Sequence, residues 1–305
     1  MKKYFSIIVL CHFFLQTLVV EANMIHKKEL FNIKNSPDYI KLFFESKDID
    51  ITKVNFLLDN SSKTYPIYLS ETNLGLIYYA DVLNKENNKI AREFYYTKYD
   101  SISGKWITPL NISNDYEAFY TENKKLNFEE LYVTINNDIY VINLKEEKFN
   151  LTSLNINSKY IETSPAISPD GNTLFFVSDR KNGMGGKDIY ACERLTDRSW
   201  STPYNLGRDI NTAEDEESPF MMTDGASLYF SSKGHDTNGG FDIFETTQTE
   251  TGLWLSPQKI NAPLNSAYDE YFFIINSKGS VAFYTSEKNQ CEHNDIYSVT
   301  GQIIY

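Results

Sequence analysis

Cysteine and histidine are scarce in this chain of 305 residues, which contains three cysteines and four histidines. Cys11 falls inside an apolar N-terminal run, so only Cys192 and Cys291 remain for a folded part, and two cysteines do not make a disulfide framework. We expect both to be free thiols, with a single bridge between them as the alternative. A zinc site needs three or four ligands. His235 and His293 occupy equivalent loops of the repeat described below, but no third ligand accompanies them.

Long apolar runs are absent except at the N-terminus. Lys2 and Lys3 precede a largely apolar stretch, Phe5 to Val20, which is followed by a cleavage-compatible Ala22. A basic start, a short apolar core and a cleavage site are typical of a secretory signal peptide, whereas a membrane-spanning helix needs about 20 apolar residues. We therefore predict that residues 1–22 are a signal peptide and that the mature protein is exported, to the periplasm or to the outer surface. An N-terminal membrane anchor is the alternative.

Positive charge is in short supply. The chain has 29 Lys and Arg residues against 41 Asp and Glu residues, and its formal net charge is −12 at pH 7. An acidic surface repels nucleic acids and anionic membranes. We therefore expect no nucleic-acid partner and no membrane span in the mature chain. The acidity favours either plain solubility or a cationic partner.

Common enzyme motifs are missing as well. The sequence has no Gly-x-Ser-x-Gly nucleophile elbow and no Gly-rich phosphate loop. Ser168-x-Asp-Gly resembles part of the Asp-box of sialidases, but Phe175 stands where that motif ends in Trp. Asp236, Asn238 and Asp242 offer oxygen ligands for calcium but match no complete calcium loop. We expect no catalytic residue, no metal ion and no cofactor. A binding function is therefore favoured over an enzymatic one.

What the sequence does contain is a repeat with a period of 54 residues. Glu162-Thr-Ser-Pro begins one copy and Glu216-Glu-Ser-Pro begins the next, and the turn residues Gly171 and Gly225 keep the same spacing. Each copy continues with an aromatic segment, Leu-Phe-Phe-Val-Ser or Leu-Tyr-Phe-Ser-Ser, and then with Asp-Ile-Tyr or Asp-Ile-Phe. A third copy begins at Glu270, and two weaker copies lie between residues 64 and 155. A fixed period of this size marks a repeat architecture.

Each copy holds four short apolar or aromatic segments separated by Gly, Pro, Asn and Asp. The 22 Tyr and 20 Phe residues concentrate in these segments, where aromatic side chains suit β-strands. Four-stranded units arranged in a ring form a β-propeller. We predict an all-β fold, a single propeller of five blades over residues 51–305, with Val54–Leu58 completing the last blade. Residues 23–50 are of uncertain structure. A sixth blade using the segment at Ser36, or an open solenoid, is the alternative.

The Ser-Pro-Asp-Gly turn, the Leu-Tyr-Phe-Ser strand and the Gly-Gly-Phe-Asp-Ile-Phe segment resemble one known repeat family. It is the Pro-Asp variant of the WD-type propeller repeats, the TolB-like family found in cell-envelope proteins of Bacteroidetes. The resemblance is strong from Tyr160 to Tyr297 and weaker from Thr64 to Asn155. It implies an exported binding or scaffolding module, because such propellers are generally not enzymes themselves. Fold resemblance alone does not establish function.

Two sets of recurring carboxylates are candidate site residues. A glutamate precedes the first, innermost strand of four of the five copies, and these are Glu117, Glu162, Glu216 and Glu270. Around a channel mouth they could bind a cation or a basic peptide end. Alternatively, each accepts backbone N–H bonds in the turn between blades. An aspartate opens the third strand of four copies, where it can fix the preceding loop, and these are Asp138, Asp188, Asp242 and Asp295.

We therefore hypothesise an exported, non-enzymatic and monomeric β-propeller that binds a protein or peptide partner in the bacterial cell envelope. The alternative hypothesis is a carbohydrate-active propeller that binds or cleaves glycans with Trp, Tyr and paired carboxylates.

Overall fold

The computed structural model describes residues 50–54, 63–69, 75–84, 89–100, 102–113, 130–144, 146, 150–196, 198–287 and 295–300. All of them belong to one compact unit, Asp48–Gln302. Within these ranges the chain forms strands and turns and no helix, which confirms the predicted all-β fold. In the same ranges, accordingly, no helix is long and apolar enough to cross a membrane.

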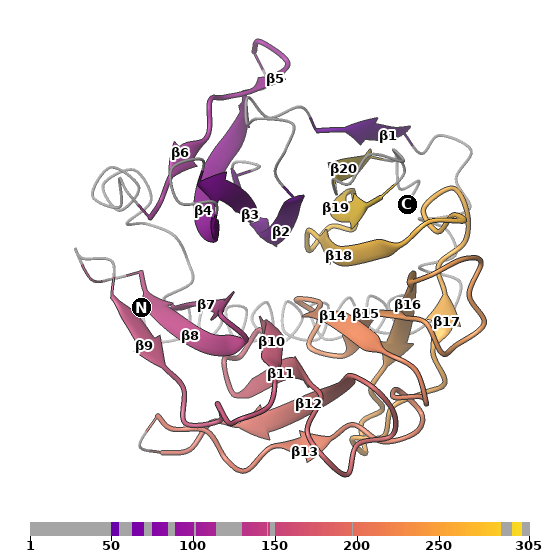
Figure 1. Cartoon of the computed structure of the whole chain (residues 1–305). Coiled ribbons are helices and arrows are strands. Elements are labelled where there is room, and N and C mark those ends of the chain that lie inside the picture. The colour runs from indigo at the N-terminus through magenta and orange to yellow at the C-terminus, as the bar shows by residue number, and fades with distance from the viewer. Residues whose placement is uncertain are drawn as a thin grey trace, which may run out of the picture. The chain divides into compact units, whose positions relative to one another are not determined.

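Five antiparallel sheets surround a common centre and form the five blades of a β-propeller (Figure 1). The first blade is built from β2 (Lys63–Leu69), β3 (Gly75–Asn84) and β4 (Lys89–Asp100), with the short strands β5 (Lys105–Trp106) and β6 (Leu110–Asn111) both pairing with β4. The second blade has β7 (Glu130–Ile135), β8 (Asp138–Asn143) and β9 (Leu151–Ser153) within the described residues.

Blades three to five repeat one order of strands from the centre outwards. The third is β10 (Glu162–Ile167), β11 (Thr173–Ser178), β12 (Asp188–Glu193) and β13 (Tyr204–Asn205). The fourth is β14 (Glu216–Met221), β15 (Ser227–Ser232), β16 (Asp242–Thr247) and β17 (Gln258–Lys259). The fifth is β18 (Glu270–Ile275), β19 (Val281–Ser286), β20 (Asp295–Thr300) and β1 (Asp50–Lys53). The predicted number of five blades is confirmed.

The last blade takes its outer strand from the N-terminal side of the propeller. β1 pairs antiparallel with β20, so that Asp50 lies opposite Thr300, and the Val54 N–H donates to the Ile296 carbonyl over 2.9 Å. The closing strand therefore precedes the predicted segment Val54–Leu58, of which only Val54 is described. The free edge of β20 needs only an extended partner, so the pairing leaves no strong mark in the sequence of β1.

Apolar and aromatic side chains pack between neighbouring blades. Ile77 and Phe94 of the first blade meet Leu131 and Val133 of the second. Equivalent clusters join the second blade to the third, the third to the fourth and the first to the fifth. The Tyr229 and Phe273 rings, 4.9 Å apart, join the fourth blade to the fifth. Each buried large side chain stabilises such an interface by about 1.5–3 kcal/mol, and together they close the ring.

The innermost strands carry a β-bulge at one repeated position. The pairing of β10 with β11, β14 with β15 and β18 with β19 shifts register after Thr163, Glu217 and Tyr271. The next residues, Ser164, Ser218 and Phe272, have positive φ angles of 50°, 54° and 52°. Non-glycine residues rarely adopt this conformation, at a cost of about 1–3 kcal/mol. Its threefold recurrence shows that blade packing enforces it, and a bulge re-aims the side chains around it.

Candidate functional site

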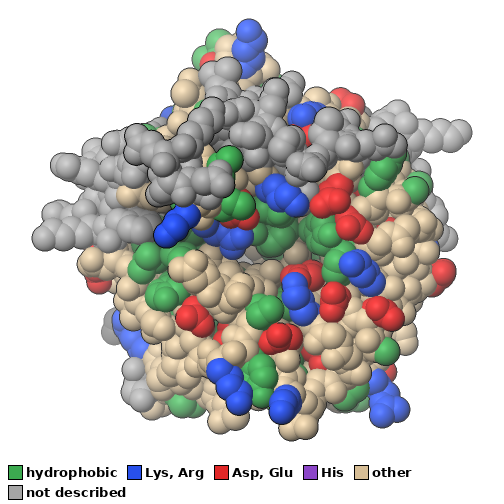
Figure 2. Space-filling model, viewed as in Figure 1, with side chains coloured by type: hydrophobic (Ala, Val, Ile, Leu, Met, Phe, Trp, Pro, Cys, Tyr) green, Lys and Arg blue, Asp and Glu red, His purple; other side chains and the backbone are tan. Residues whose placement is uncertain are grey.

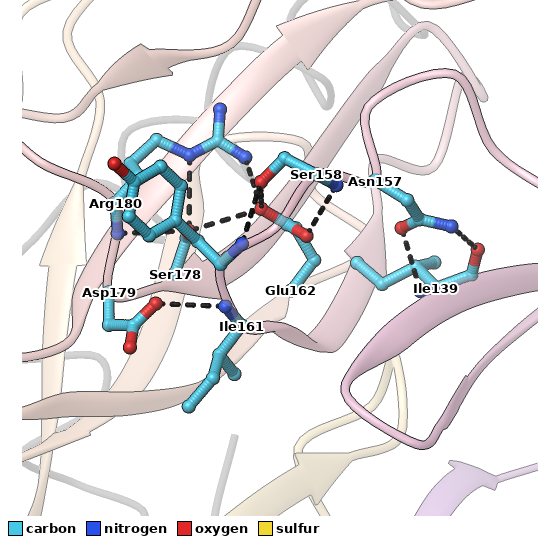
Figure 3. A network of polar contacts seen from close by, with 9 residues as sticks. Ile139, Asn157, Ser158, Ile161, Glu162, Ser178, Asp179 and Arg180 are labelled. Carbon is cyan, nitrogen blue, oxygen red and sulfur yellow. Dashed lines mark hydrogen bonds and ion pairs between the residues drawn. The ribbon is translucent and has the colours of Figure 1, made fainter.

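The repeated glutamate of the third blade is held inside its own turn. Glu162 is fully buried, and its Oε2 atom accepts the Ser158 N–H over 2.9 Å. Its Oε1 atom accepts the Ser158 hydroxyl over 2.6 Å and the Arg180 guanidinium over 2.9 Å. Figure 3 shows the carboxyl group between these two residues, with Ser178 also pointing towards it. The side chain therefore ties the turn entering β10 to the end of β11.

The next two blades repeat this arrangement. Glu216 accepts the Thr212 N–H over 2.8 Å and the Thr212 hydroxyl over 2.7 Å, and Glu270 accepts the same two groups of Ser266. The hydroxyl of the facing strand adds a third bond from Ser232 or Ser286. Both glutamates are fully buried. Glu117, the fourth candidate, lies outside the described residues.

An asparagine just before each of these turns is a position that the search for repeats missed. The Asn211 amide accepts the Ile189 N–H over 2.8 Å and donates to the Ile189 carbonyl over 2.9 Å. Asn157 makes the same two bonds with Ile139, and Asn265 makes them with Ile243. The side-chain amide thus continues the sheet where a backbone strand would. The spacing of 54 residues between these asparagines was the signal that could have found them.

We expect Asn211→Ala to lower the free energy of unfolding by about 2–3 kcal/mol, because it leaves the buried Ile189 N–H without its acceptor and removes a donor from the Ile189 carbonyl, which then keeps the Leu206 N–H at 3.2 Å. Asn211→Asp should cost at least as much, since a carboxylate oxygen would face the Ile189 carbonyl. Urea denaturation at pH 7 measures both. The control is Asn150→Ala, an exposed asparagine whose side chain donates to Glu146 over 3.0 Å. A cost below about 0.5 kcal/mol at Asn211, similar to an ordinary surface substitution, would contradict this role.

The third and fourth blades differ in what accompanies the glutamate. In the third blade Arg180 pairs with Glu162 and lies over the rings of Phe176 and Tyr190, at 5.1 and 4.9 Å. In the fourth blade His235 lies against both equivalent rings, 5.8 Å from Phe230 and 5.1 Å from Phe244, and its Nε2 atom is 2.9 Å from the Ile210 carbonyl oxygen. Burial raises the pKa of Glu216 to about 7, although the hydrogen bonds that its carboxyl group accepts lower the pKa.

The aspartates that open the third strands are also engaged locally. The Oδ2 atom of Asp188 accepts the Met184 N–H over 2.5 Å, and that of Asp242 accepts the Asn238 N–H over 2.6 Å, so each binds the loop before its strand. Burial raises the pKa of both carboxyl groups. Asp295 forms an ion pair of 2.7 Å with Lys53 of β1. Asp138 follows a two-residue turn at the start of β8.

A lysine ammonium group of the chain itself contacts the loop that holds the possible calcium ligands Asp236 and Asn238. The Lys259 ammonium donates to the Asn238 side-chain oxygen over 2.9 Å and lies 3.7 Å from Asp236. Across the described ranges, no three His, Cys, Asp or Glu side chains are grouped closely enough to hold a metal ion. His293 and Cys291 lie outside these ranges. Cys192 is a buried free thiol whose pKa burial raises to about 12.

In the fourth blade, the residue after the repeated glutamate contacts the inner strand of the third blade. Glu217 of β14 forms an ion pair of 2.6 Å with Lys187 and accepts the Ser164 hydroxyl of β10 over 3.4 Å. On the other side of the ring, the Tyr65 ring of β2 lies 5.0 Å from the Phe272 ring of β18. We call Tyr65, Lys187, Glu217, Tyr271 and Phe272 the inner-strand cluster. All five are partly exposed, unlike the buried glutamates beside them.

The charges of this cluster are fixed at neutral pH. Burial opposes the charge on Lys187, but the Glu217 carboxylate prevails and raises the pKa of the ammonium. Burial and the carboxylate of Asp269, which accepts the Tyr271 hydroxyl over 2.8 Å, raise the pKa of Tyr271. The tyrosine hydroxyls therefore stay protonated. Figure 2 shows a hollow at the centre of the molecule with acidic, basic and hydrophobic side chains around it.

An arginine extends the cluster towards the first blade. Arg92 forms a two-pronged ion pair with Asp81, over 2.8 and 3.0 Å, and donates to the Thr134 carbonyl of the second blade over 3.3 Å. Its guanidinium lies 4.0 Å from the centre of the Tyr79 ring, and that ring stacks on Tyr65 at 4.7 Å. Charged and aromatic groups of the first and fifth blades are thus in contact with one another, as are polar groups of the third and fourth blades.

Comparisons with known proteins identify no family for this chain. No protein-family model matches the chain, and no curated protein matches it. Among solved structures it is similar to a putative TolB from Agrobacterium tumefaciens, with 14% identity over 78% of this chain and 77% of that one and a TM-score of 0.39. It is also similar to an endo-arabinase from Bacteroides thetaiotaomicron, with 15% identity over 83% of this chain and 98% of that one and a TM-score of 0.47. The RS223 β-xylosidase is similar with 10% identity over 82% of this chain and 94% of that one and a TM-score of 0.48. At such low likeness the function has to be argued from this chain's own residues.

Proposed function

We propose that this chain is an exported, non-enzymatic β-propeller that binds a protein or peptide partner in the bacterial cell envelope, and that the inner-strand cluster is its binding site. The observation that carries the proposal is a contrast between repeated and unrepeated positions. Residues that build a blade recur in the third, fourth and fifth copies, as Glu162, Glu216 and Glu270 do.

The residue types found in the cluster do not recur from one copy to the next. Thr163, Glu217 and Tyr271 occupy one position in successive copies, directly after the glutamate, and share neither charge nor size. A repeat that served the fold alone would have no need for such differences at a partly exposed position. A ring of differing polar and aromatic groups instead suits recognition of one particular surface, because specific interfaces rely on a few aromatic and charged anchors.

The state of the repeated carboxylates supports binding over catalysis. A glycosidase works with two carboxyl groups about 5–10 Å apart on either side of an open site. Glu162, Glu216 and Glu270 are fully buried and accept hydrogen bonds from their own turns. Glycan binding without cleavage is the second candidate function, because the Tyr65 and Phe272 rings lie 5.0 Å apart and the neighbouring Tyr271 hydroxyl donates to Asp269, an arrangement that also suits sugars.

Export rests on the predicted signal peptide, residues 1–22, which lies outside the described ranges. The acidic net charge of −12 agrees with a partner that is neither nucleic acid nor an anionic membrane. The periplasm and the outer surface are both consistent with these features.

The test is affinity capture from solubilised cell envelopes with the mature chain and with Glu217→Gln/Tyr271→Ala. We expect the wild type to retain a defined partner and the variant to lose it at least tenfold. The control is Glu193→Gln/Tyr204→Ala, which changes the same two residue types at the exposed outer edge of the third blade, where the Tyr204 hydroxyl donates to Glu193 over 2.9 Å. Equal recovery by all three proteins would contradict the proposal, and binding to a glycan array that depends on Tyr271 would favour the second candidate.

A further inference from the structure

The first blade carries a hairpin that the other blades lack within the described ranges. β3 and β4 have 10 and 12 residues, whereas β11, β12, β15 and β16 have six each. The Ala80–Glu93 pair takes the place of Ser178–Asp188, with which the sheet of the third blade ends. Beyond Ala80 the two strands remain paired up to Asn84 and Lys89. This two-stranded ribbon therefore projects past the end of its blade.

One face of the ribbon changes from buried to exposed along its length. Side chains two residues apart on a strand share a face, and directly opposed residues are neighbours. The pairs on this face are Tyr79 with Phe94, then Asp81 with Arg92, then Leu83 with Ile90. The first pair is buried, whereas Leu83 is 41% exposed and Ile90 is 71% exposed. An apolar pair thus ends the ribbon in contact with solvent.

This face is continuous with the inner-strand cluster. Arg92 lies over the Tyr79 ring at 4.0 Å, Tyr79 stacks on Tyr65 at 4.7 Å, and Tyr65 lies 5.0 Å from Phe272. Each step is a direct side-chain contact. A ligand reaching from the centre of the ring to Leu83 would pass over the partly exposed Tyr65 and Arg92, with the Tyr79 ring buried beneath them.

The central end of this surface is acidic. The carboxylates of Glu217 and Glu287 both raise the pKa of Tyr65 and of Tyr271, after the larger effect of burial, so both lie near these rings. Asp269 lies beside Tyr271 as well. Lys187 pairs with Glu217 over 2.6 Å and Arg92 pairs with Asp81 over 2.8 Å, and the Lys233 ammonium lies over the Phe241 ring beside Tyr271. With Asp269 and Glu287, four carboxylates face three cations here, which leaves a small excess of negative charge. Such an excess favours a cationic group on the partner.

We infer that the surface from the inner-strand cluster to the Leu83–Ile90 pair docks an extended segment of another protein, with a basic side chain at the acidic centre and apolar side chains on the hairpin. The inference deepens the proposed function and rests on it. The acidic centre supplies charge complementarity, and the exposed apolar pair supplies area that contact with a partner would remove from water.

The test begins by selecting peptides from a random 12-residue phage library on the immobilised mature chain. We expect the enriched peptides to combine Lys or Arg with Leu, Ile, Phe or Trp. A synthetic peptide of the most enriched sequence is then titrated calorimetrically. Leu83→Ser/Ile90→Ser should weaken its binding about tenfold or more. Glu217→Gln should weaken it several-fold and should reduce its dependence on salt.

The matched control is Leu253→Ser/Leu255→Ser, an equally exposed pair of leucines in the turn before β17 of the fourth blade. It should bind the peptide as the wild type does, and circular dichroism checks that every variant is folded. Enrichment of acidic peptides, or of none, would overturn the inference. So would a peptide that is insensitive to the Leu83–Ile90 change. If that peptide still responds to Glu217→Gln, the proposed function stands without the hairpin; if it responds to neither, both fail.

Discussion

Replacing Glu245 with glutamine is expected to raise the free energy of unfolding at pH 9 by about 4 kcal/mol, the largest gain that any single substitution offers here. Glu245 lies in β16 of the fourth blade with 6% of its surface exposed. Its Oε1 atom has no hydrogen-bond partner among the described residues. Burial, opposed by a hydrogen bond from Tyr229, raises the pKa of the carboxyl group from 4.5 to about 8.

The sign of the effect follows from where the proton is held. Between pH 4.5 and 8 the folded chain keeps a proton on Glu245 that the unfolded chain has released. Stability from this group is therefore complete below pH 4.5, is lost as the pH rises through this window, and stays low above pH 8. Glutamine has nearly the same shape and no charge to bury, so the variant does not suffer this loss.

Urea denaturation of wild type and Glu245→Gln at pH 5 and pH 9 measures the difference. We expect less than about 1 kcal/mol between them at pH 5 and about 4 kcal/mol at pH 9. Glu193→Gln, in the equivalent strand of the third blade and exposed, is the control and should change neither value. An identical difference at both pH values would show that Glu245 is ionised in the folded chain.

The second large effect is expected at Glu162. Its removal by Glu162→Ala should lower the free energy of unfolding by about 3–5 kcal/mol, because it leaves a partly buried guanidinium without its carboxylate. It also leaves the Ser158 N–H and hydroxyl without an acceptor. Glu162→Gln keeps one acceptor oxygen and the shape, so we expect it to cost about half as much.

Thermal and urea unfolding at pH 7 check this prediction, with Glu214→Ala as an exposed control next to the equivalent turn of the fourth blade. Arg180→Ala completes a double-mutant cycle, which isolates the energy of the Glu162–Arg180 pair. Loss of less than about 1 kcal/mol on Glu162→Ala would mean that the turn holds without its carboxylate.

The blades themselves could be predicted because they reuse the same contacts. The bonds of Glu162 to Ser158 recur at Glu216 and Glu270, so the residues that make them recur every 54 positions and the period reveals the third, fourth and fifth blades. The closing strand β1 could not be placed in the same way. Its partner β20 accepts an extended segment through backbone bonds, and backbone bonds require no particular side chain.

The candidate site could be predicted only in part. The repeated glutamates mark the correct end of each inner strand, but an N–H and a hydroxyl four residues earlier draw their carboxyl groups into the turn. The residue after the glutamate makes other contacts: Glu217 pairs with Lys187, and the Tyr271 hydroxyl donates to Asp269. Because these residues differ between copies, a search for repeats cannot find them. The ion pair of Arg92 with Asp81 depends on the long hairpin of one blade alone.

The pairing of β1 with β20 also decides how the molecule responds to mechanical force. Asp50 and Thr300 lie opposite each other at one end of this antiparallel pair, and Lys53 and Tyr297 lie near its other end. Tension applied to the chain on both sides of the propeller therefore loads the Asp50–Thr300 end first. The hydrogen bonds of the pair then break in succession instead of sharing the load in shear. The ring would open between β1 and β20 at low force, while the other four blades were still intact.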